Sequence, residues 1–313
     1  PPRSTLFPYT TLFRSRNVTS YSQRLILHAC PRKYQLAMHR ANQEGESELA
    51  GTNLDFAFGH AVGAGVQNWL LTKSLAKAGL NASLAWSAGF HDRKDRAKKS
   101  LWESIIAVGK FVEFFEHELE EWELMHLPNG KPAIELSFSL RTNSGYRDYG
   151  HIDIVLRHRY SGRLAVLELK TTEREPEEAQ YANSSQALGY SVMLGAVYPE
   201  IAEYDVIYCV YSSALREWNL LPFGKTLLSR AEWIKDLLLD HSALDTYHEI
   251  GFYPKRGESC FDYRRRCEFF GECNIVPRDE LPWLEEEKEA EEVDWVVNLD
   301  EVIKQLKESK DES

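Results

Sequence analysis

The sequence lacks any long run of apolar residues. No window of its 313 positions approaches the roughly 18 residues needed to cross a membrane. It also lacks the Gly-x4-Gly-Lys-Ser/Thr loop that cradles nucleotide phosphates, so an ATP-driven motor would have to lie on another chain. No internal repeat is present. A composition of 43% hydrophobic and 27% charged residues instead predicts a soluble globular protein with a sizeable core.

Negative charge is confined to one end of the chain. The formal net charge is −11, of which residues 279–313 carry −10 and the other 278 positions carry −1. Because the body is almost neutral, the overall acidity does not argue against a nucleic-acid partner. We interpret the acidic tail as a solubilising segment, a partner-binding segment or a DNA mimic that limits nonspecific binding.

The first fifteen residues are unlike the rest of the chain. Residues 5–15 resemble the in-frame translation of a common sequencing-adapter oligonucleotide. We therefore interpret residues 1–15 as non-native and leave them out of the fold prediction. A native N-terminal segment is the alternative.

Apolar periodicity predicts helices in the first half of the chain and a strand-rich second half. Helices are predicted to begin at a Ser20 or Ser22 cap and at Pro31, and to cover 56–78 and 101–122, the last ending before Pro128. Strands are predicted over 133–141, 149–158, 163–171, 204–211 and 216–221, and further helices over 177–197, 224–248 and 299–306.

This order of elements predicts an α/β fold, with a central mixed sheet flanked by helices, a helical N-terminal part and a Cys-rich C-terminal coil. We predict a single domain over 16–278. It comprises a helical part (16–130), an αβ core (131–250) and a cysteine-bearing end (251–278), and the acidic tail (279–313) follows it.

Charged residues interrupt two otherwise apolar strands. Asp153 stands in Ile-Asp-Ile-Val-Leu, and Glu168 and Lys170 stand in Val-Leu-Glu-Leu-Lys. Side chains alternate along a strand, so Glu168 and Lys170 share one face. A turn at Ser161-Gly162 would bring Asp153 alongside Glu168. With the backbone carbonyl of Leu169, the two carboxylates form a hard-oxygen site suited to Mg²⁺ or Mn²⁺.

Such an ion can polarise a phosphodiester and lower the pKa of a bound water, which Lys170 would orient or help to deprotonate. The alternative is a solvated face of an ordinary hairpin. Charges inside buried strands cost several kcal/mol unless they are paired or bind a metal, which favours a site.

Asp153 and Glu168-x-Lys170 resemble the PD-(D/E)XK nuclease superfamily, in its RecB-like exonuclease branch. Tyr21-Ser22, followed by Cys30-Pro-Arg-Lys-Tyr, is similar to the helix-and-cysteine opening of that branch. The resemblance spans about residues 19–275. It implies a restriction-endonuclease-like core and metal-dependent cleavage of DNA in bacterial or phage DNA processing.

Two helical motifs bear on the site that this resemblance implies. Gln186-Ala-Leu-Gly-Tyr190 resembles the Gln-x3-Tyr helix of the branch, whose side chains would position the nucleophilic water or a phosphate. An ordinary buried Gln–Tyr contact is the alternative. Where the branch usually has a metal-binding histidine, this chain has Gly63. His60, one turn earlier on nearly the same helix face, is a candidate ligand or a histidine with no such role.

The cysteines divide into one core thiol and one candidate cluster. Cys209 lies in an apolar strand, where a buried thiol is expected. The resemblance implies that Cys30, Cys260, Cys267 and Cys273 hold a 4Fe-4S cluster, with Zn²⁺ and unligated or disulfide-bonded cysteines as alternatives. The Cys-x6-Cys-x5-Cys spacing departs from the usual Cys-x2-Cys-x5-Cys. Thiolate ligation would imply a reducing, cytoplasmic compartment.

Basic residues flank these cysteines. Arg32 and Lys33 follow the first cysteine, and Arg264, Arg265 and Arg266 lie between the second and the third. Basic side chains interleaved with aromatic ones favour binding of DNA ends or single strands. A solvated loop with balanced charge is the alternative.

We therefore hypothesise an Mg²⁺- or Mn²⁺-dependent DNA exonuclease of the cytoplasm. Asp153 and Glu168 would hold the metal, Lys170 would activate water, and Gln186 and Tyr190 would support the site. The rival hypotheses are a DNA-binding or recombination-accessory module with little cleavage, suggested by Gly63, and a nuclease subunit that works with a helicase or in spacer acquisition.

Overall fold

The computed structural model describes residues 18–44, 54–89, 96–201, 204–262, 265–275 and 293–311. The fifteen residues interpreted as non-native, and the first half of the acidic tail, lie outside these ranges. The described residues divide into two compact units. Unit 1 comprises residues from 54–136 and 151–230, and unit 2 comprises residues from 18–44, 137–150 and 231–311. The prediction of one domain over 16–278 stays a prediction.

Unit 2 begins with a short strand and two helices. Strand β1 (Val18–Ser20) leads into α1 (Tyr21–Ala29), and α2 (Pro31–Glu44) follows. The Ser20 side chain accepts a hydrogen bond from the Gln23 amide at 3.4 Å, which caps α1 as predicted. Proline suits the first position of α2 because its missing N–H has no partner there in any helix.

In unit 1, the helix predicted over 56–78 is wrong, because two helices occupy this stretch. Helix α3 (Leu54–Thr72) ends where Lys73 takes a left-handed φ of 51°. The hydroxyl of Ser74 then accepts from the Lys77 amide at 3.4 Å and starts α4 (Leu75–Gly89). Periodicity alone missed this break because apolar spacing continues across it.

The long helix predicted to reach Trp122 is also shorter than expected. Helix α5 (Leu101–Glu118) stops four residues earlier, and Trp122–Leu124 forms strand β2, which pairs antiparallel with β4. Trp122 continues the apolar spacing of α5 but packs against the core of unit 1 from a strand instead.

The second half of the chain forms a mixed sheet, as predicted, and the fold is mixed α/β. The predicted helix over 177–197 is divided into two. The elements of this half of the chain are, in order, β3 (Ile134–Arg141), β4 (Arg147–His158), β5 (Leu164–Thr172), α6 (Glu178–Ala182), α7 (Ser185–Val197), β6 (Tyr204–Ser212), β7 (Glu217–Lys225) and α8 (Leu227–Glu249).

The sheet has the order β10-β3-β4-β5-β6-β7, with β1 and β2 also paired to β4. Its first strand, β10 (Trp295–Asn298), comes from the acidic tail and pairs in parallel with β3. Helix α9 (Leu299–Asp311) follows it, which confirms the helix predicted over 299–306 and extends it by five residues. A 3-10 turn, η1 (Gly257–Cys260), and a small hairpin of β8 (Phe261–Asp262) and β9 (Arg265–Arg266) form the cysteine-bearing end.

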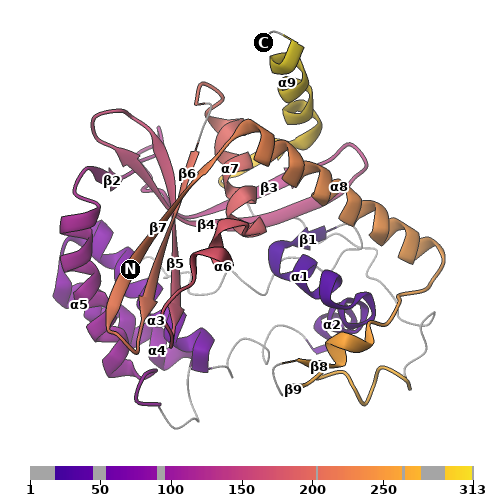
Figure 1. The fold of residues 1–313 in the computed structure, drawn as a ribbon, viewed down its shortest axis with the longest axis horizontal. Coiled ribbons are helices and arrows are strands. Elements are labelled where there is room, and N and C mark those ends of the chain that lie inside the picture. Colours follow the sequence, from indigo (N-terminus) through magenta and orange to yellow (C-terminus); the bar gives the residue numbers. More distant parts are fainter. Residues whose placement is uncertain are drawn as a thin grey trace. The chain divides into compact units, whose positions relative to one another are not determined.

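Strands β4 and β5 separate at one point, and this fork positions the candidate site. Residues 154–157 of β4 pair with residues 164–167 of β5. Beyond this ladder, β5 continues beside β6 as far as Thr172. Helices α3, α4 and α5 cover the face that carries Leu167 (Figure 1). Because side chains alternate, Glu168 and Lys170 lie on the opposite face.

Helix α5 is fixed to the sheet of unit 1 by one buried carboxylate. Glu103 is 1% exposed and accepts hydrogen bonds from the Tyr211 hydroxyl at 2.7 Å and from Arg216 Nε at 3.1 Å. We expect Glu103→Ala to lower the free energy of unfolding by about 2–3 kcal/mol. The change leaves the buried Tyr211 hydroxyl without this acceptor and removes buried side-chain volume, whereas Arg216 is 56% exposed and stays hydrated.

Urea unfolding measures this loss, and Glu113→Ala is its control. Glu113 pairs with Lys110 at 3.0 Å on the exposed side of the same helix, where removal costs less than about 0.5 kcal/mol. Equal losses in the two variants would contradict the assigned role of Glu103.

None of the helices in the described ranges is both long and apolar enough to cross a membrane.

Candidate active site

Two carboxylates predicted from the sequence meet at the fork between β4 and β5. Asp153 and Glu168 are the next residues after the last pair of the ladder, Ile154 and Leu167. Asp153 Oδ2 accepts from the Leu169 amide at 3.4 Å, so the main chain of Leu169 borders the site. Glu168 is 1% exposed, and its Oε2 is buried without a hydrogen-bond partner. A buried, unpaired carboxylate oxygen is costly unless a cation or donor occupies the space in front of it.

A third carboxylate, Glu135, joins these two and was missed from the sequence. It lies at the start of β3 with a left-handed φ of 49°, which a non-glycine residue adopts only under constraint. Its Oε1 accepts from Gln67 of α3 at 2.5 Å, while its Oε2 is buried without a partner. A charge within a predicted strand was the available signal, but nothing in the sequence links positions 67 and 135.

The three carboxylates repel one another through poorly solvated surroundings. Burial raises the pKa of Asp153 well above its usual range, and the charges of Glu168 and Glu135 raise it further. Burial also raises the pKa of Glu135, which the Gln67 hydrogen bond partly offsets. Crowded, buried carboxylates shift in this direction because each resists ionisation beside the others. A cation among them would relieve this repulsion.

Lys170 is held beside the carboxylates by a chain of hydrogen bonds. Its Nζ donates to Glu168 Oε1 at 2.6 Å and to Gln186 Oε1 at 3.1 Å, and Gln186 Nε2 donates to the Tyr190 hydroxyl at 2.7 Å. Burial alone would lower the pKa of Lys170, but the charges of Glu168 and Asp153 raise it above the ordinary value. The lysine therefore stays charged here and its ammonium is fixed in direction.

The chemistry of these donors fits a divalent cation. They are hard oxygen ligands, which Mg²⁺ and Mn²⁺ prefer, and two of the oxygens have no protein partner. In the described part of the chain, no three His, Cys, Asp or Glu side chains are arranged to hold a metal ion by themselves. Mg²⁺ commonly uses one or two carboxylates and keeps several waters, so Asp153, Glu168 and the Leu169 main chain suffice.

The candidate ligand His60 lies on α3, and its ring stacks on that of Phe56, with centroids 6.0 Å apart and planes 16° apart. Burial lowers the pKa of His60. Its role as a metal ligand stays a prediction. At Gly63, a Cβ atom would meet nothing within 4 Å, so the position where the branch usually has histidine has room for a side chain.

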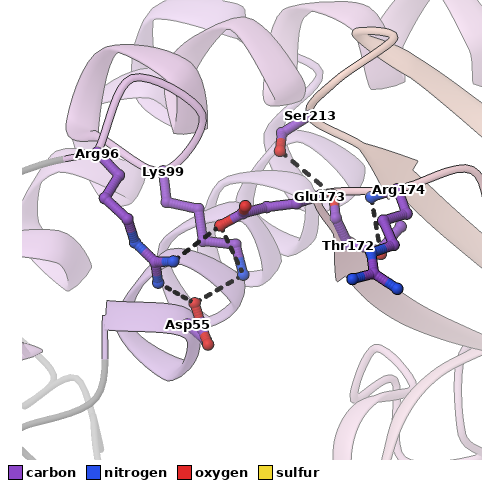
Figure 2. Close-up of polar contacts among 7 residues, drawn as sticks. All are labelled: Asp55, Arg96, Lys99, Thr172, Glu173, Arg174 and Ser213. Atoms are coloured by element: carbon purple, nitrogen blue, oxygen red, sulfur yellow. Dashed lines mark hydrogen bonds and ion pairs between the residues drawn. The ribbon is translucent and has the colours of Figure 1, made fainter.

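An ion-pair network connects the start of α3 with the end of β5 (Figure 2). Lys99, whose side chain is 8% exposed, and Arg96 both lie 2.7 Å from Asp55 Oδ1. Both also approach Glu173 Oε1, Arg96 at 3.2 Å and Lys99 at 3.8 Å. The two positive and two negative charges balance, so the network joins three segments of unit 1 rather than forming a basic patch.

The cysteines predicted to form a cluster gather in unit 2. Burial raises the pKa of the Cys260 thiol, and Cys267, Cys273 and Cys30 act on it in the same direction. The Cys30 sulfur lies 3.5 Å from the Arg256 amide. All five cysteines are described, and all are free thiols. Cys209 is fully buried in β6, as predicted.

The basic residues predicted to contact DNA differ in exposure. Arg32 is 0% exposed and donates to Gln35 within unit 2. Lys33 pairs with Glu268 at 3.6 Å, and the exposed Arg266 lies over the ring of Phe270 at 4.9 Å. Arg264 and the side chain of Arg265 lie outside the described residues.

Comparison with known proteins identifies one family. The pattern of the PD-(D/E)XK nuclease superfamily matches residues 18–274. A search of curated proteins found no match. Among solved structures, the "Putative exonuclease" of Eubacterium rectale is 12% identical with a TM-score of 0.42, covering 78% of this chain and 85% of that one. A structure named SSO0001 is 14% identical with a TM-score of 0.31, covering 83% of this chain and 99% of that one.

Proposed function

The chain belongs to the PD-(D/E)XK nuclease superfamily, and on that premise we propose that it is a metal-dependent DNA exonuclease acting on ends or single strands. Membership of the superfamily indicates a phosphodiester hydrolase. The observation that carries the proposal is the pair of buried carboxylates at the fork, Asp153 and Glu168, beside an ammonium that is fixed by Gln186 and Tyr190.

Each residue has a distinct task in this proposal. Asp153 and Glu168 hold Mg²⁺ or Mn²⁺, and Glu135 adds negative charge from the third side. The bound ion would polarise the phosphodiester and lower the pKa of an attacking water. Lys170 orients that water or stabilises the charge that develops on the phosphate. Gln186 holds the Lys170 ammonium in its orientation, because its side chain accepts a hydrogen bond from Lys170 and donates one to Tyr190.

Degradation of end-labelled single- and double-stranded DNA in Mn²⁺ tests the proposal. The protein, truncated to remove residues 1–15, is purified anaerobically. The Glu168→Ala and Lys170→Ala variants are prepared and assayed in the same way. We expect cleavage in the parent protein and none in either variant, and the label reports polarity. DNA binding without any cleavage would contradict the exonuclease and favour the DNA-binding accessory module.

The accessory module is favoured by one observation, the absence of a histidine at Gly63. Because a Cβ atom there meets nothing within 4 Å, we expect Gly63→His to fold normally and to bind Mn²⁺ several-fold more tightly, as measured by calorimetry. A modest gain in cleavage supports a working natural nuclease. A gain from undetectable to rapid cleavage supports the accessory module. Gly109→His, at another open helical position, is the control.

We further propose that Cys30, Cys260, Cys267 and Cys273 ligate a 4Fe-4S cluster. Their mutual electrostatic influence supports this proposal. Among the described residues, no three His, Cys, Asp or Glu side chains are already arranged around a common metal position. Zn²⁺ and unligated cysteines therefore stay the alternatives.

The proposed DNA surface near this cluster includes Lys33 and Arg266. We predict that Arg264 and Arg265, which directly precede Arg266 in the sequence, belong to it as well. The stacking of Arg266 on the partly exposed Phe270 supports it, because such pairs bind unstacked bases. Arg32 is not included because its guanidinium is fully buried. A helicase or recombination partner stays a hypothesis that pull-down with and without the acidic tail would test.

A further inference from the structure

One face of α3 is partly exposed, whereas Phe58, Ala61 and Val62 on its other side are buried in the core of unit 1. The face runs through Phe56, His60, Gly63 and Gln67, which follow one another at steps of four, three and four. Residues at these steps lie above one another on a helix. At one end of the face, Gln67 donates to the carboxylate of Glu135. The face therefore begins at the candidate active site.

The other end of this face carries an aromatic pair. Phe56 is 46% exposed, and the His60 ring lies nearly parallel to it at 6.0 Å. Such a pair presents a flat, partly desolvated surface. An exposed phenylalanine ring stacks best on other flat ring systems, in offset or edge-to-face geometry.

Two glycines flank His60 on α3, one packed against β5 and one beside open space. A Cβ at Gly59 would lie 3.4 Å from Thr171 Oγ1, the residue that follows Lys170, so this part of the helix lies against β5. At Gly63 the space is open to 4 Å. The helix backbone is therefore uncovered at Gly63, between the aromatic pair and Gln67.

The start of the helix is also held rigidly. Asp55, directly before Phe56, is fixed by Arg96 and Lys99, and both of these also approach Glu173 at the end of β5 (Figure 2). A surface that is ordered before binding loses little entropy when a ligand arrives. These ion pairs join the start of α3, next to Phe56, to the end of the strand that carries Glu168 and Lys170.

The length of α3 sets the distance between the aromatic pair and Gln67, the residue that contacts Glu135. At 1.5 Å per residue, His60 lies about 10 Å and Phe56 about 16 Å from Gln67 along the axis. These spans correspond to about three to five nucleotides of a stacked strand, and to fewer in an extended one.

We propose that Phe56 and His60 form a stacking site for an unpaired base of the DNA strand, a few nucleotides from the bond that is cleaved. The inference rests on the proposed nuclease function and specifies its substrate, because only a single-stranded or frayed end offers a free base face. Phe56 is the main contact, and His60 supports its ring.

An abasic scan of a single-stranded oligonucleotide tests this site. One base at a time is removed, and the dissociation constant is measured in EDTA by fluorescence anisotropy for the full protein and for Phe56→Ala. We expect one position at which the missing base weakens binding about tenfold in the parent protein. In Phe56→Ala the same removal should have no further effect, since a base and a ring that contact each other are coupled in a double-mutant cycle. Phe56→Trp should restore the penalty.

Tyr160→Ala is the matched control. Tyr160 is 81% exposed and also lies beside a histidine, His158, at 5.9 Å, but at the turn between β4 and β5 and with its ring tilted by 68°. This variant should keep the full abasic penalty. The inference is overturned if no position couples to Phe56, if Tyr160→Ala abolishes the coupling equally, or if the parent protein does not bind the strand.

Cleavage in Mn²⁺ separates this result from the proposed function. Coupling without cleavage would leave the stacking site standing and contradict the nuclease. Cleavage without coupling would support the nuclease and remove the stacking site.

Discussion

Replacing Asp153 with asparagine is expected to abolish cleavage and, at the same time, to raise the melting temperature. Loss of one metal-binding carboxylate removes several kcal/mol of transition-state stabilisation, about a thousandfold in rate. Stability moves the other way because Asp153 is buried and its pKa is raised by burial, Glu168 and Glu135. An amide of the same shape removes this repulsion.

The pH dependence of stability gives the same prediction a second readout. A carboxyl group whose pKa is higher in the folded than in the unfolded protein destabilises the fold above that pKa. The parent protein should therefore gain stability as the pH falls through the folded pKa of Asp153, and the asparagine variant should gain less. Thermal unfolding between pH 8 and pH 5 without divalent ions measures the difference.

Asp148→Asn is the matched control, because the same substitution should have the opposite effect on stability. Asp148 is also buried and its pKa is raised by burial, but it pairs with Arg24 at 3.6 Å and accepts from Thr19 at 2.8 Å. Neutralising it removes one of the two carboxylates that pair with the buried Arg24 guanidinium, the other being Asp240 at 3.6 Å. The melting temperature should therefore fall while cleavage persists. If Asp153→Asn also melts lower, repulsion among the carboxylates does not govern stability at the fork.

Replacing Cys267 with serine is expected to remove iron and acid-labile sulfide from the anaerobically purified protein and to lower its melting temperature by about 10 °C or more. The proposed cluster joins Cys30 to cysteines more than 200 residues away. A cross-link closing a loop of that length is worth about 5 kcal/mol in the chain-entropy model. For a protein of this size, each kcal/mol corresponds to about 2–4 °C.

Cys209→Ala is the control for this prediction. Cys209 is fully buried in β6, where burial raises its thiol pKa, so it should lose some packing but no iron. Metal analysis of both variants distinguishes a bound iron cluster from bound zinc. Zinc in place of iron, or full stability in Cys267→Ser, would contradict the 4Fe-4S proposal.

The acidic tail shows where composition was a poor guide. Its charge predicted a solvated segment with at most one helix, yet Trp295–Asn298 adds a parallel strand beside β3. Asp294, just before it, accepts hydrogen bonds from the Ser137 amide and hydroxyl at 3.0 Å. Strand addition satisfies backbone groups at a sheet edge, and a count of charges does not report that possibility.

The sequence by itself determined the hairpin and the chemistry of its face. Alternation along two apolar strands placed Glu168 and Lys170 together, and the turn at Ser161-Gly162 set the register that brings Asp153 opposite Glu168. The i, i+4 spacing aligned Gln186 with Tyr190, and the structure adds the hydrogen bond between them. These patterns are local, with periods of 2.0 residues in strands and 3.6 in helices, so residues close together in the sequence are enough to predict them.

Only the tertiary structure decided which distant groups meet. Gln67 and Glu135 lie 68 positions apart and join because α3 packs beneath the sheet and Glu135 adopts a left-handed backbone. The division of one apolar run into α3 and α4 at Lys73, and the burial of Arg32, likewise depend on packing across the chain. Such contacts arise from the shape of the folded core, which no local spacing encodes.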